Sequence, residues 1–317
     1  MFGLYQTKLL MMDVINTENL TKHYGELRAA EDVTLNVRQG EIYGFLGLNG
    51  AGKTTTIRML LGMIRPTRGD AWLFGRKADP GDLDLWNRVG HLVELPCSYP
   101  ELTVLENLHI FYRMRLLNDP ALLKDIMEQL TLSPYRDIKV RNLSLGNIQR
   151  LGIAKAMIHR PGLLVLDEPA NGLDPAGIVQ IREILTDLAV NHGVTIFISS
   201  HILEEISRFA TRIGIIHEGH MIRESEVDSL DRSRHRALHV TTSDNKKAIE
   251  IIRREDLSPV VRDDGSIEIA GEQAITHPEK ITALLADQGL PPCRVVVEEE
   301  DLEHYFLRII RNNERQS

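Results

Sequence analysis

The sequence predicts an α/β fold with a parallel sheet covered by helices, followed by a small α+β domain of the ferredoxin-like type. A glycine-rich loop at residues 47–54 lies between a strand-like and a helix-like segment. Two continuous apolar runs, Leu163–Leu166 and Val194–Ile198, are typical of parallel strands that are buried on both faces. Beyond residue 237 the pattern becomes strand, helix, two strands, helix and strand, which is the split βαβ order.

The other elements of the first domain follow from local patterns. Val33–Val37 alternates apolar and polar residues, as a half-buried strand does. The helix after the glycine loop is expected to end at Gly62, with Pro66 beyond. Residues 102–132 show helical spacing only and predict an all-helical insertion, and Pro175 opens a further helix. More strands are expected at 41–46, 70–75, 213–216 and 221–222.

In the second domain, single residues mark where elements begin and turn. Asp244 is expected to cap the first helix, and Asp264-Gly265 to turn a hairpin. Pro278 opens the second helix, which should end at Gly289. The acidic run Glu298–Asp301 is expected to place negative charge at the start of the last helix.

The composition is that of a globular protein, with 317 residues, 43% hydrophobic residues and a net charge of −8. This charge argues against a nucleic-acid partner. Two distant cysteines, Cys97 and Cys293, predict no disulfide framework and fit a reducing cytosol. No apolar run reaches the eighteen or so residues of a membrane helix, and Leu9–Met12 is too short for a signal-peptide core. The sequence therefore predicts a chain that neither spans a membrane nor is secreted.

Residues Gly47–Thr54 match the phosphate-binding pattern G-x-x-x-x-G-K-[ST] at every specified position. Glycines let successive backbone N–H groups face one anion, and the start of the following helix favours negative charge. Lys53 would reach the β- and γ-phosphates of a nucleotide, and the Thr54 hydroxyl would hold Mg²⁺. The predicted phosphate-contacting residues are Asn49, Gly50, Ala51, Gly52, Lys53, Thr54 and Thr55.

A pair of acids, Asp167-Glu168, follows the apolar run Leu163–Leu166. Since ligands of α/β sheets bind at the carboxyl ends of the strands, these carboxylates should lie near the phosphate loop. Asp167 is expected to hold Mg²⁺, directly or through water. Glu168 is expected to orient and deprotonate an attacking water.

The chain contains two further motifs, Leu143–Arg150 and Asn171–Pro175, and then a histidine, His201. Together with the phosphate loop and the acidic strand, they resemble the nucleotide-binding subunit of ATP-binding cassette (ABC) transporters over residues 13–225. The resemblance implies a head-to-tail dimer that buries two ATP molecules. Each ATP would lie between the phosphate loop of one subunit and the signature segment (Leu143–Arg150) of the other.

The resemblance also assigns roles to single residues. Tyr24 would stack on adenine, and His201 would contact the γ-phosphate. Ser144 and Gly146 would contact the γ-phosphate bound by the partner subunit, and Asp174 would interact across the dimer. With Lys53 and Glu168, His201 completes the predicted catalytic set.

Three positions depart from the family pattern. Leu145 stands where a second glycine is usual, and Asn147 where glutamine is usual. The side chain of Leu145 removes the close approach that glycine allows, so the contact with the partner's phosphate is expected to be looser. Glu94 replaces a glutamine that senses Mg²⁺ and the attacking water, and we expect Glu94 to contact metal and nucleotide.

Glu94 and the segment Pro96–Leu108 look like those of exporters of the bacitracin-resistance and lantibiotic-immunity type. This implies an ATP-hydrolysing subunit that powers a separate transmembrane permease from the cytoplasmic face of the membrane. The second ATPase subunit is expected to be another copy of this chain, and a heterodimer stays open as the alternative.

The resemblance also gives the domain boundaries. Residues 1–12 are an N-terminal extension and 13–225 the ATPase domain, with a helical subdomain at about 95–160. Polar residues at 226–236 predict a linker, and 237–317 an accessory domain.

There are two alternatives to a transporter subunit. A non-transport ABC ATPase acting on DNA or the ribosome is disfavoured. Only about 110 residues separate Thr54 from Asp167, without sustained heptads, and the chain has a single phosphate loop. A weakly hydrolysing regulator stays open because of Leu145 and Glu94.

The pair His217 and His220 favours a solvated hairpin over a metal site.

Overall fold

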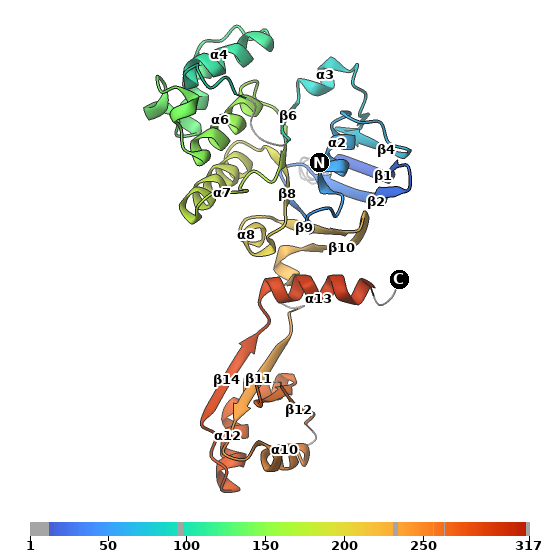
Figure 1. The fold of residues 1–317 in the computed structure, drawn as a ribbon, viewed down its shortest axis with the longest axis vertical. Helices are drawn as coiled ribbons and strands as arrows, with labels where there is room; N and C mark the ends of the chain where they lie inside the picture. Colours follow the sequence, from blue (N-terminus) through green and yellow to red (C-terminus); the bar gives the residue numbers. More distant parts are fainter. Residues whose placement is uncertain (1–12, 94–97, 231–233, 256, 263, 315–317) are drawn as a thin grey trace, which may run out of the picture. The chain divides into compact units, whose positions relative to one another are not determined.

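The computed structural model describes residues 13–93, 98–230, 234–255, 257–262 and 264–314. The chain divides into two compact units, Met1–Asp228 and Ser229–Ser317, which are drawn in Figure 1. The division falls inside the segment 226–236 that the sequence assigns to a linker. Regular structure reaches into this segment, because the last strand of the first unit ends at Glu226 and a 3₁₀ turn, η3, spans Val227–Ser229.

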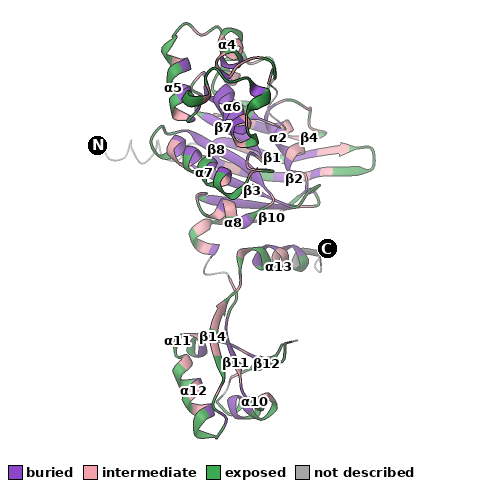
Figure 2. Cartoon of the chain, turned by 60° about the vertical axis from the view of Figure 1, so that its left-hand side comes forward, coloured by how far each residue is buried: buried purple, intermediate pink, exposed green. Residues whose placement is uncertain are grey.

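The first unit is built on a six-stranded sheet in the order β10-β9-β3-β8-β7-β6. Strand β10 pairs antiparallel with β9 at one edge, and the other neighbours pair in parallel. Strands β3, β7 and β8 are buried along their whole length (Figure 2), which confirms the predicted covered parallel sheet. The bounds are β3 Ile42–Leu46, β6 Val89–Leu92, β7 Leu163–Asp167, β8 Thr195–Ser200, β9 Arg212–His217 and β10 His220–Glu226.

A second sheet of the first unit is antiparallel, in the order β2-β1-β4-β5. Its strands are β1 Asp13–Tyr24, β2 Leu27–Arg38, β4 Arg68–Leu73 and β5 Arg76–Lys77. The sequence predicted parts of β2 and β4 but not the long strand β1. Tyr24 is the last residue of β1 and is about half exposed.

Helices cover both faces of the six-stranded sheet. On one face, Ile57 and Leu60 of α2 share a core with Phe45 and with Phe197, whose ring centroids lie 5.3 Å apart. On the other face, α8 approaches β3 closely, since a Cβ at Gly44 would lie 2.3 Å from Cγ2 of Ile206. The bounds are α2 Lys53–Leu60, α3 Leu83–Trp86, α7 Pro175–Val190 and α8 Leu203–Ser207.

Helices and 3₁₀ turns follow one another from Val104 to Met157, and this stretch includes most of the segment 102–132 for which the sequence predicts helices. Thr103 and Glu106 close a capping box at the start of its first helix. The elements are α4 Val104–Met114, α5 Ala121–Gln129, the 3₁₀ turns η1 Ser133–Tyr135 and η2 Val140–Asn142, and α6 Leu145–Met157. Within the described part of the chain, no helix is both long and apolar enough to cross a membrane.

The C-terminal unit is a four-stranded antiparallel sheet in the order β12-β13-β11-β14. This order and the intervening helices confirm the predicted ferredoxin-like arrangement. Asp244 caps α10 by accepting a hydrogen bond from the Lys247 backbone N–H at 3.1 Å, as predicted. The bounds are β11 Arg236–Thr241, α10 Asn245–Arg253, β12 Pro259–Val261, β13 Ile267–Ala270, α11 Glu272–Thr276, α12 Pro278–Asp287, β14 Arg294–Glu299 and α13 Leu302–Glu314.

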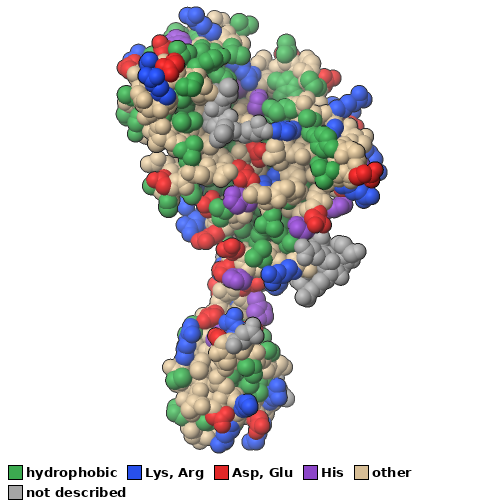
Figure 3. All heavy atoms as spheres, viewed as in Figure 1, with side chains coloured by type: hydrophobic (Ala, Val, Ile, Leu, Met, Phe, Trp, Pro, Cys, Tyr) green, Lys and Arg blue, Asp and Glu red, His purple; other side chains and the backbone are tan. Residues whose placement is uncertain are grey.

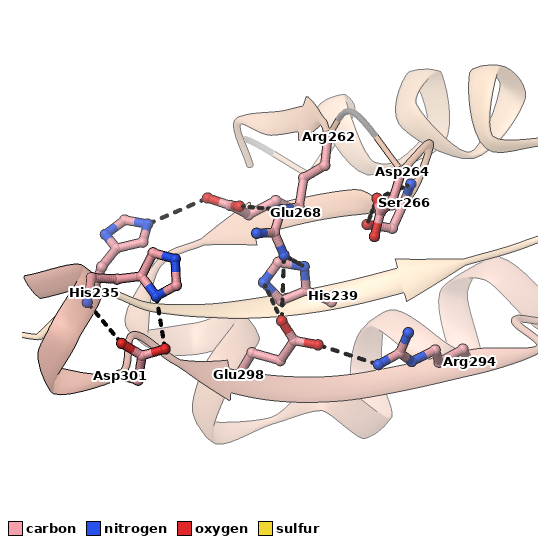
Figure 4. A network of polar contacts seen from close by, with 10 residues as sticks. His235, His239, Arg262, Asp264, Ser266, Glu268, Arg294, Glu298 and Asp301 are labelled. Atoms are coloured by element: carbon pink, nitrogen blue, oxygen red, sulfur yellow. Dashed lines mark hydrogen bonds and ion pairs between the residues drawn. The ribbon is translucent and has the colours of Figure 1, made fainter.

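The two faces of this sheet differ. Leu238 and Val240 of β11 pack in the hydrophobic core with α10 and α12, so His239 between them points to the other face. Charged side chains from neighbouring strands meet there (Figure 4). Acidic and basic side chains are also interspersed on the surface of this unit in Figure 3.

The prediction for the acidic run 298–301 was only partly right. Asp301 caps α13 by accepting from the His304 backbone N–H at 2.7 Å. Glu298 and Glu299 instead end β14. The register of β14 with β11 places Glu298 opposite Ala237, on the same sheet face as His239. The Glu298 side chain takes part in ion pairs on this face, and its Oε2 lies 3.7 Å from His239 Nε2.

Candidate functional site

The glycine loop 47–52 joins the central strand β3 to α2. Gly50 and Gly52 have φ angles of 83° and 106°, a backbone region that favours glycine. A side chain at Gly52 is also excluded by space, since its Cβ would lie 2.4 Å from the Ala29 carbonyl oxygen. The loop is therefore packed against the β1–β2 hairpin, and it ends at the start of α2, where backbone N–H groups favour an anion.

Lys53, the first residue of α2, is almost fully buried, with 5% of its surface exposed. Its Nζ donates to the carbonyl oxygens of Gly47 at 2.7 Å and Leu48 at 3.2 Å. Nζ also forms an ion pair with Glu168 Oε1 at 3.0 Å. The only strong negative partner of this buried ammonium in the described chain is thus the predicted general base.

Glu168 is held from both sides. His201 Nδ1 lies 2.9 Å from Glu168 Oε2, opposite the contact with Lys53. Burial alone would raise the pKa of Glu168, but the hydrogen bond and charge of Lys53, together with His201, outweigh it and lower the pKa. Glu168 is therefore ionised at neutral pH, which is the state that a proton acceptor needs. Its φ of 47° is uncommon for a residue with a side chain.

Asp167, at the end of β7, is bound by two hydroxyl groups. Thr54 Oγ1 donates to Asp167 Oδ2 at 2.7 Å, and Ser199 Oγ donates to Asp167 Oδ1 at 2.5 Å. Ser199 Oγ in turn accepts from the Glu168 backbone N–H at 2.9 Å. Thr54 and Asp167 provide adjacent oxygen donors, the ligand type that Mg²⁺ prefers. The residues present therefore fit a Mg²⁺ ion.

Ser199 was not predicted as a site residue. It follows the apolar run Val194–Ile198, and in the structure it is the register partner of Asp167 across β7 and β8. The sequence signal is weak, because a serine after a core strand is common. Only the strand pairing shows that Ser199 fixes the orientation of both acids.

A cavity of about 520 Å³ lies over the glycine loop. It brings together predicted residues from the loop and α2 with Glu168 and with the β1–β2 hairpin. The lining residues are Leu27, Arg28, Ala29, Asn49, Gly50, Gly52, Lys53, Thr54, Thr55, Glu168 and Glu218. Arg28 and Glu218 were not predicted from the sequence.

The signature residues do not line this cavity. Ser144 is the N-cap of α6, and its Oγ accepts from the Asn147 backbone N–H at 3.4 Å. Leu145 is 39% exposed, and its Cδ2 would lie 3.2 Å from a Cβ at Gly172. The signature segment thus packs beside the loop that contains Gly172 and Asp174 of the same subunit.

Among the other predicted residues, Asp174 caps α7 by accepting from the Gly177 backbone N–H at 2.8 Å. Gly146 is the second residue of α6. Ala51 is buried within the glycine loop, and the Tyr24 ring lies 5.0 Å from the Nζ of Lys22. Glu94 lies outside the described residues.

These observations define a class of protein. The parallel sheet carries a glycine loop between its central strand β3 and α2, and an acid pair at the end of β7, with β8 between the two strands. This is the P-loop architecture of nucleotide-binding ATPases. The family model described as "ABC transporter" matches residues 30–171.

Known proteins resemble the chain over most of its length. It is 40% identical over 305 residues to the bacitracin transport ATP-binding protein BcrA of Bacillus licheniformis, covering 95% of this chain and 98% of that protein. It is 38% identical over 215 residues to the lantibiotic transport ATP-binding protein SrtF of Streptococcus pyogenes, which covers 68% of this chain and 92% of that protein. Among solved structures, the chain is similar to a dimeric ATP-binding cassette that is bound to ADP and Pi in a post-hydrolysis state. The TM-score is 0.61 and the identity 25%, and the match covers 67% of this chain and 98% of that one.

The chain belongs to the ABC transporter family and is one of its ATP-binding subunits. ATP binding and hydrolysis are the general activity of this family. Its ATP-binding subunits dimerise and work with membrane permeases.

Proposed function

We propose that this chain hydrolyses MgATP in a head-to-tail dimer and powers a separate membrane permease that exports a drug or an antimicrobial peptide. The observation that carries the hydrolytic part is the convergence of Lys53, Asp167 and Glu168 beside one cavity. Lys53 contacts Glu168 at 3.0 Å, and Thr54 contacts Asp167 at 2.7 Å. A buried cation, a metal-binding oxygen pair and an ionised carboxylate are the groups that phosphoryl transfer to water requires.

Lys53 links substrate binding to the activation of water. A bound γ-phosphate would compete with Glu168 for the Lys53 ammonium, because both are anions within reach of the same Nζ. Once Lys53 turns to the phosphate, Glu168 becomes free to accept a proton from water, while His201 holds its other oxygen. His201 would then lie beside the γ-phosphate as well.

Mg²⁺, when bound, neutralises charge on the β- and γ-phosphates. Thr54 and Asp167 would hold it, and Ser199 would orient Asp167 through its hydrogen bond. The phosphates would be surrounded by the backbone of Asn49–Gly52 and by the side chain of Thr55. Glu94 is proposed as a further contact to metal and nucleotide.

A second copy of the chain would complete the site. Ser144 and Gly146 lie at the N-terminal end of the thirteen-residue helix α6, where backbone N–H groups favour an anion. They do not line the cavity of their own subunit, which supports a role at the partner's γ-phosphate. Asp174 would act across the same interface, and Tyr24 would stack on adenine.

The proposed cargo class rests on the relatives. Two of them are named for bacitracin transport and for lantibiotic transport, and the non-transport alternative is not favoured. We place the subunit at the cytoplasmic face of the membrane, bound to its permease. The net charge of −8 supports the absence of a nucleic-acid partner.

Phosphate release by the purified full-length chain tests the hydrolytic part. Lys53→Ala should lower turnover by at least about a hundredfold, since it removes the cation that stabilises transition-state charge. Lys124→Ala on the exposed side of α5 is the matched control and should leave turnover unchanged, because among the described residues Lys124 pairs only with Glu128, at 3.7 Å on the surface. Near-normal hydrolysis by the Lys53 variant would refute the assignment.

Drug resistance in cells tests the export part. Deleting the gene should raise sensitivity to bacitracin or to a lantibiotic, and the wild-type gene should restore resistance. The Lys53→Ala gene, expressed to the same level, should not restore it. Restoration by this variant, or unchanged sensitivity after deletion to every such peptide tested, would exclude ATP-driven peptide export by this chain.

A further inference from the structure

One cationic side chain at the phosphate cavity has no role in the function described so far. Arg28, the second residue of β2, lines this cavity together with Lys53 and Thr55. Its side chain is 70% exposed. The hairpin that carries Arg28 begins directly after Tyr24, the proposed adenine contact.

Among the residues that the structure describes, the Arg28 guanidinium has only a weak acidic partner. Its Nε lies 3.8 Å from Glu31 Oε2. Glu31 is already bound by His23 Nε2 at 2.7 Å and by Arg68 Nη2 at 3.4 Å. An exposed pair at this distance contributes little, so most of the charge of Arg28 stays available to a ligand.

The backbone that carries Arg28 is fixed to the glycine loop. The Ala29 carbonyl oxygen fills the space beside Gly52, and the Glu31 N–H donates to the Gly219 carbonyl at 2.9 Å. The Gly219 N–H in turn donates to the Ala51 carbonyl at 3.0 Å. The Arg28 side chain therefore starts from a constant point on the cavity wall.

The charge balance of the cavity also favours a role for Arg28. Its lining contains two cations, Arg28 and Lys53, and two acids, Glu168 and Glu218. Without Arg28 the lining would carry a net negative charge, which opposes binding of a triphosphate. Lys53 is buried and directed into the glycine loop, so Arg28 is the cation that can reach outward.

We propose that Arg28 binds the α-phosphate of the bound nucleotide. This inference rests on the proposed function, which places the terminal phosphates at Lys53 and the adenine at Tyr24. Arg28 lines the cavity together with Lys53, and in the hairpin it pairs with His23, the residue before Tyr24. Its side chain can therefore reach the part of the nucleotide that both ATP and ADP contain. Its planar set of N–H donors suits the oxygens of a phosphate.

Nucleotide titration of the full-length protein tests the proposal. Arg28→Gln should raise the Kd of both ADP and a non-hydrolysable ATP analogue by about three- to tenfold, the cost of one partly exposed charge-assisted contact. Arg28→Lys keeps the charge and should lose less nucleotide affinity than Arg28→Gln. The salt dependence of binding should weaken in Arg28→Gln, since one cation–phosphate contact is gone.

Arg38→Gln is the matched control, because Arg38 lies at the far end of the same strand and pairs with Glu226 at 3.2 Å. It should leave both Kd values unchanged. Unchanged affinity in Arg28→Gln, an equal loss in Arg38→Gln, or a loss for the ATP analogue alone would overturn the proposal. If the wild type binds neither nucleotide, the proposed function itself is wrong, and the role of Arg28 is rejected with it.

Discussion

The two units of the chain arrange charged side chains on their sheets in different ways. In the first unit, Lys53, Asp167 and Glu168 converge at the carboxyl ends of buried parallel strands and beside a cavity. In the C-terminal unit, acids and bases lie side by side across one face of an antiparallel sheet (Figure 4).

The network of the C-terminal unit is balanced within itself. Arg262 contacts Glu268 at 3.6 Å and Glu298 at 3.3 Å, and Glu298 also contacts Arg294 at 3.3 Å. His239 Nδ1 accepts from Arg262 Nη1 at 3.2 Å. Glu268 on β13 pairs with Arg262, which follows the neighbouring strand β12, and Glu298 pairs with Arg262 and with Arg294 of its own strand β14. Opposite charges that meet on one face in this way stabilise a sheet.

Clustering of charge alone therefore does not indicate a binding site. In the first unit the groups meet at a cavity, a buried lysine faces a general base, and an exposed arginine is left weakly paired. These features need an anionic ligand to complete them. In the C-terminal unit the opposite charges already satisfy one another, so we expect this network to contribute to stability and not to catalysis.

The largest expected difference between the units concerns acid stability. Burial and then the charge of Arg115 lower the pKa of His159 in the first unit to about 4. Its Nε2 lies 3.1 Å from the Val89 carbonyl, and its buried Nδ1 has no partner among the described residues. Because the unfolded chain binds the proton near pH 6.5, the stability of this unit should fall as the pH drops from about 6.5 to 4.

The change in the pKa of His159 from 6.5 to about 4 corresponds to a loss of at most about 3 kcal/mol in the free energy of unfolding. Because the His159 ring is partly exposed, we expect the free energy of unfolding to fall by about 1–2 kcal/mol. Thermal unfolding at pH 7.5 and 5.0 measures it. His159→Gln, which can still donate to Val89, should lose less stability between the two pH values than the wild type. Parallel losses in both proteins would rule out His159 as the cause.

A smaller effect is expected when the balanced network is broken. Glu298→Gln removes the carboxylate shared by Arg262, Arg294 and His239, and should destabilise the C-terminal unit by about 1 kcal/mol, because these pairs are partly exposed. Hydrogen exchange followed by mass spectrometry should show about fivefold faster exchange in β11 and β13, with β3 and β7 unchanged.

Glu250→Gln on the exposed side of α10 is the control and should change neither exchange nor turnover. Phosphate release by Glu298→Gln should equal that of the wild type. A large loss of hydrolysis in Glu298→Gln, with the fold intact, would show that the network serves the ATPase reaction and that the contrast between the units is wrong.

The smallest effect is expected from removing the C-terminal unit. A chain that ends at Asp228 keeps both sheets and every residue proposed to bind ATP in the first unit. It should bind ATP with the affinity of the full chain, within about twofold, because no residue of the cavity is lost. An insoluble product, or one that no longer binds ATP, would show that the two units depend on each other.

Local patterns were sufficient for much of the site. The glycine loop, Lys53, and the acid pair at the end of β7 each follow from residues that are adjacent in the sequence. The strand and helix order of the C-terminal unit could be predicted for the same reason. The long strand β1 could not, because polar residues and register shifts in its pairing with β2 break the period of two.

Contacts between distant segments explain what else was missed. Ser199 acquires its role from its register with Asp167, and Arg28 from the packing of Ala29 on Gly52. Glu298 was assigned to a helix start because four acids precede α13, whereas strand pairing continues through Glu299. In each case the deciding interaction joins residues far apart in the chain, which periodicity does not report.

The central claim is that two copies of this chain enclose ATP and that Glu168 then begins its hydrolysis. Light scattering of Glu168→Gln after gel filtration tests it most directly. With ATP and Mg²⁺ the variant should elute at twice the 35.9 kDa of one chain, because ATP binds but the chemistry stalls. Without nucleotide it should elute as a monomer. A Glu168→Gln protein that stays monomeric with MgATP and still hydrolyses ATP would contradict both the role of Glu168 and the dimer.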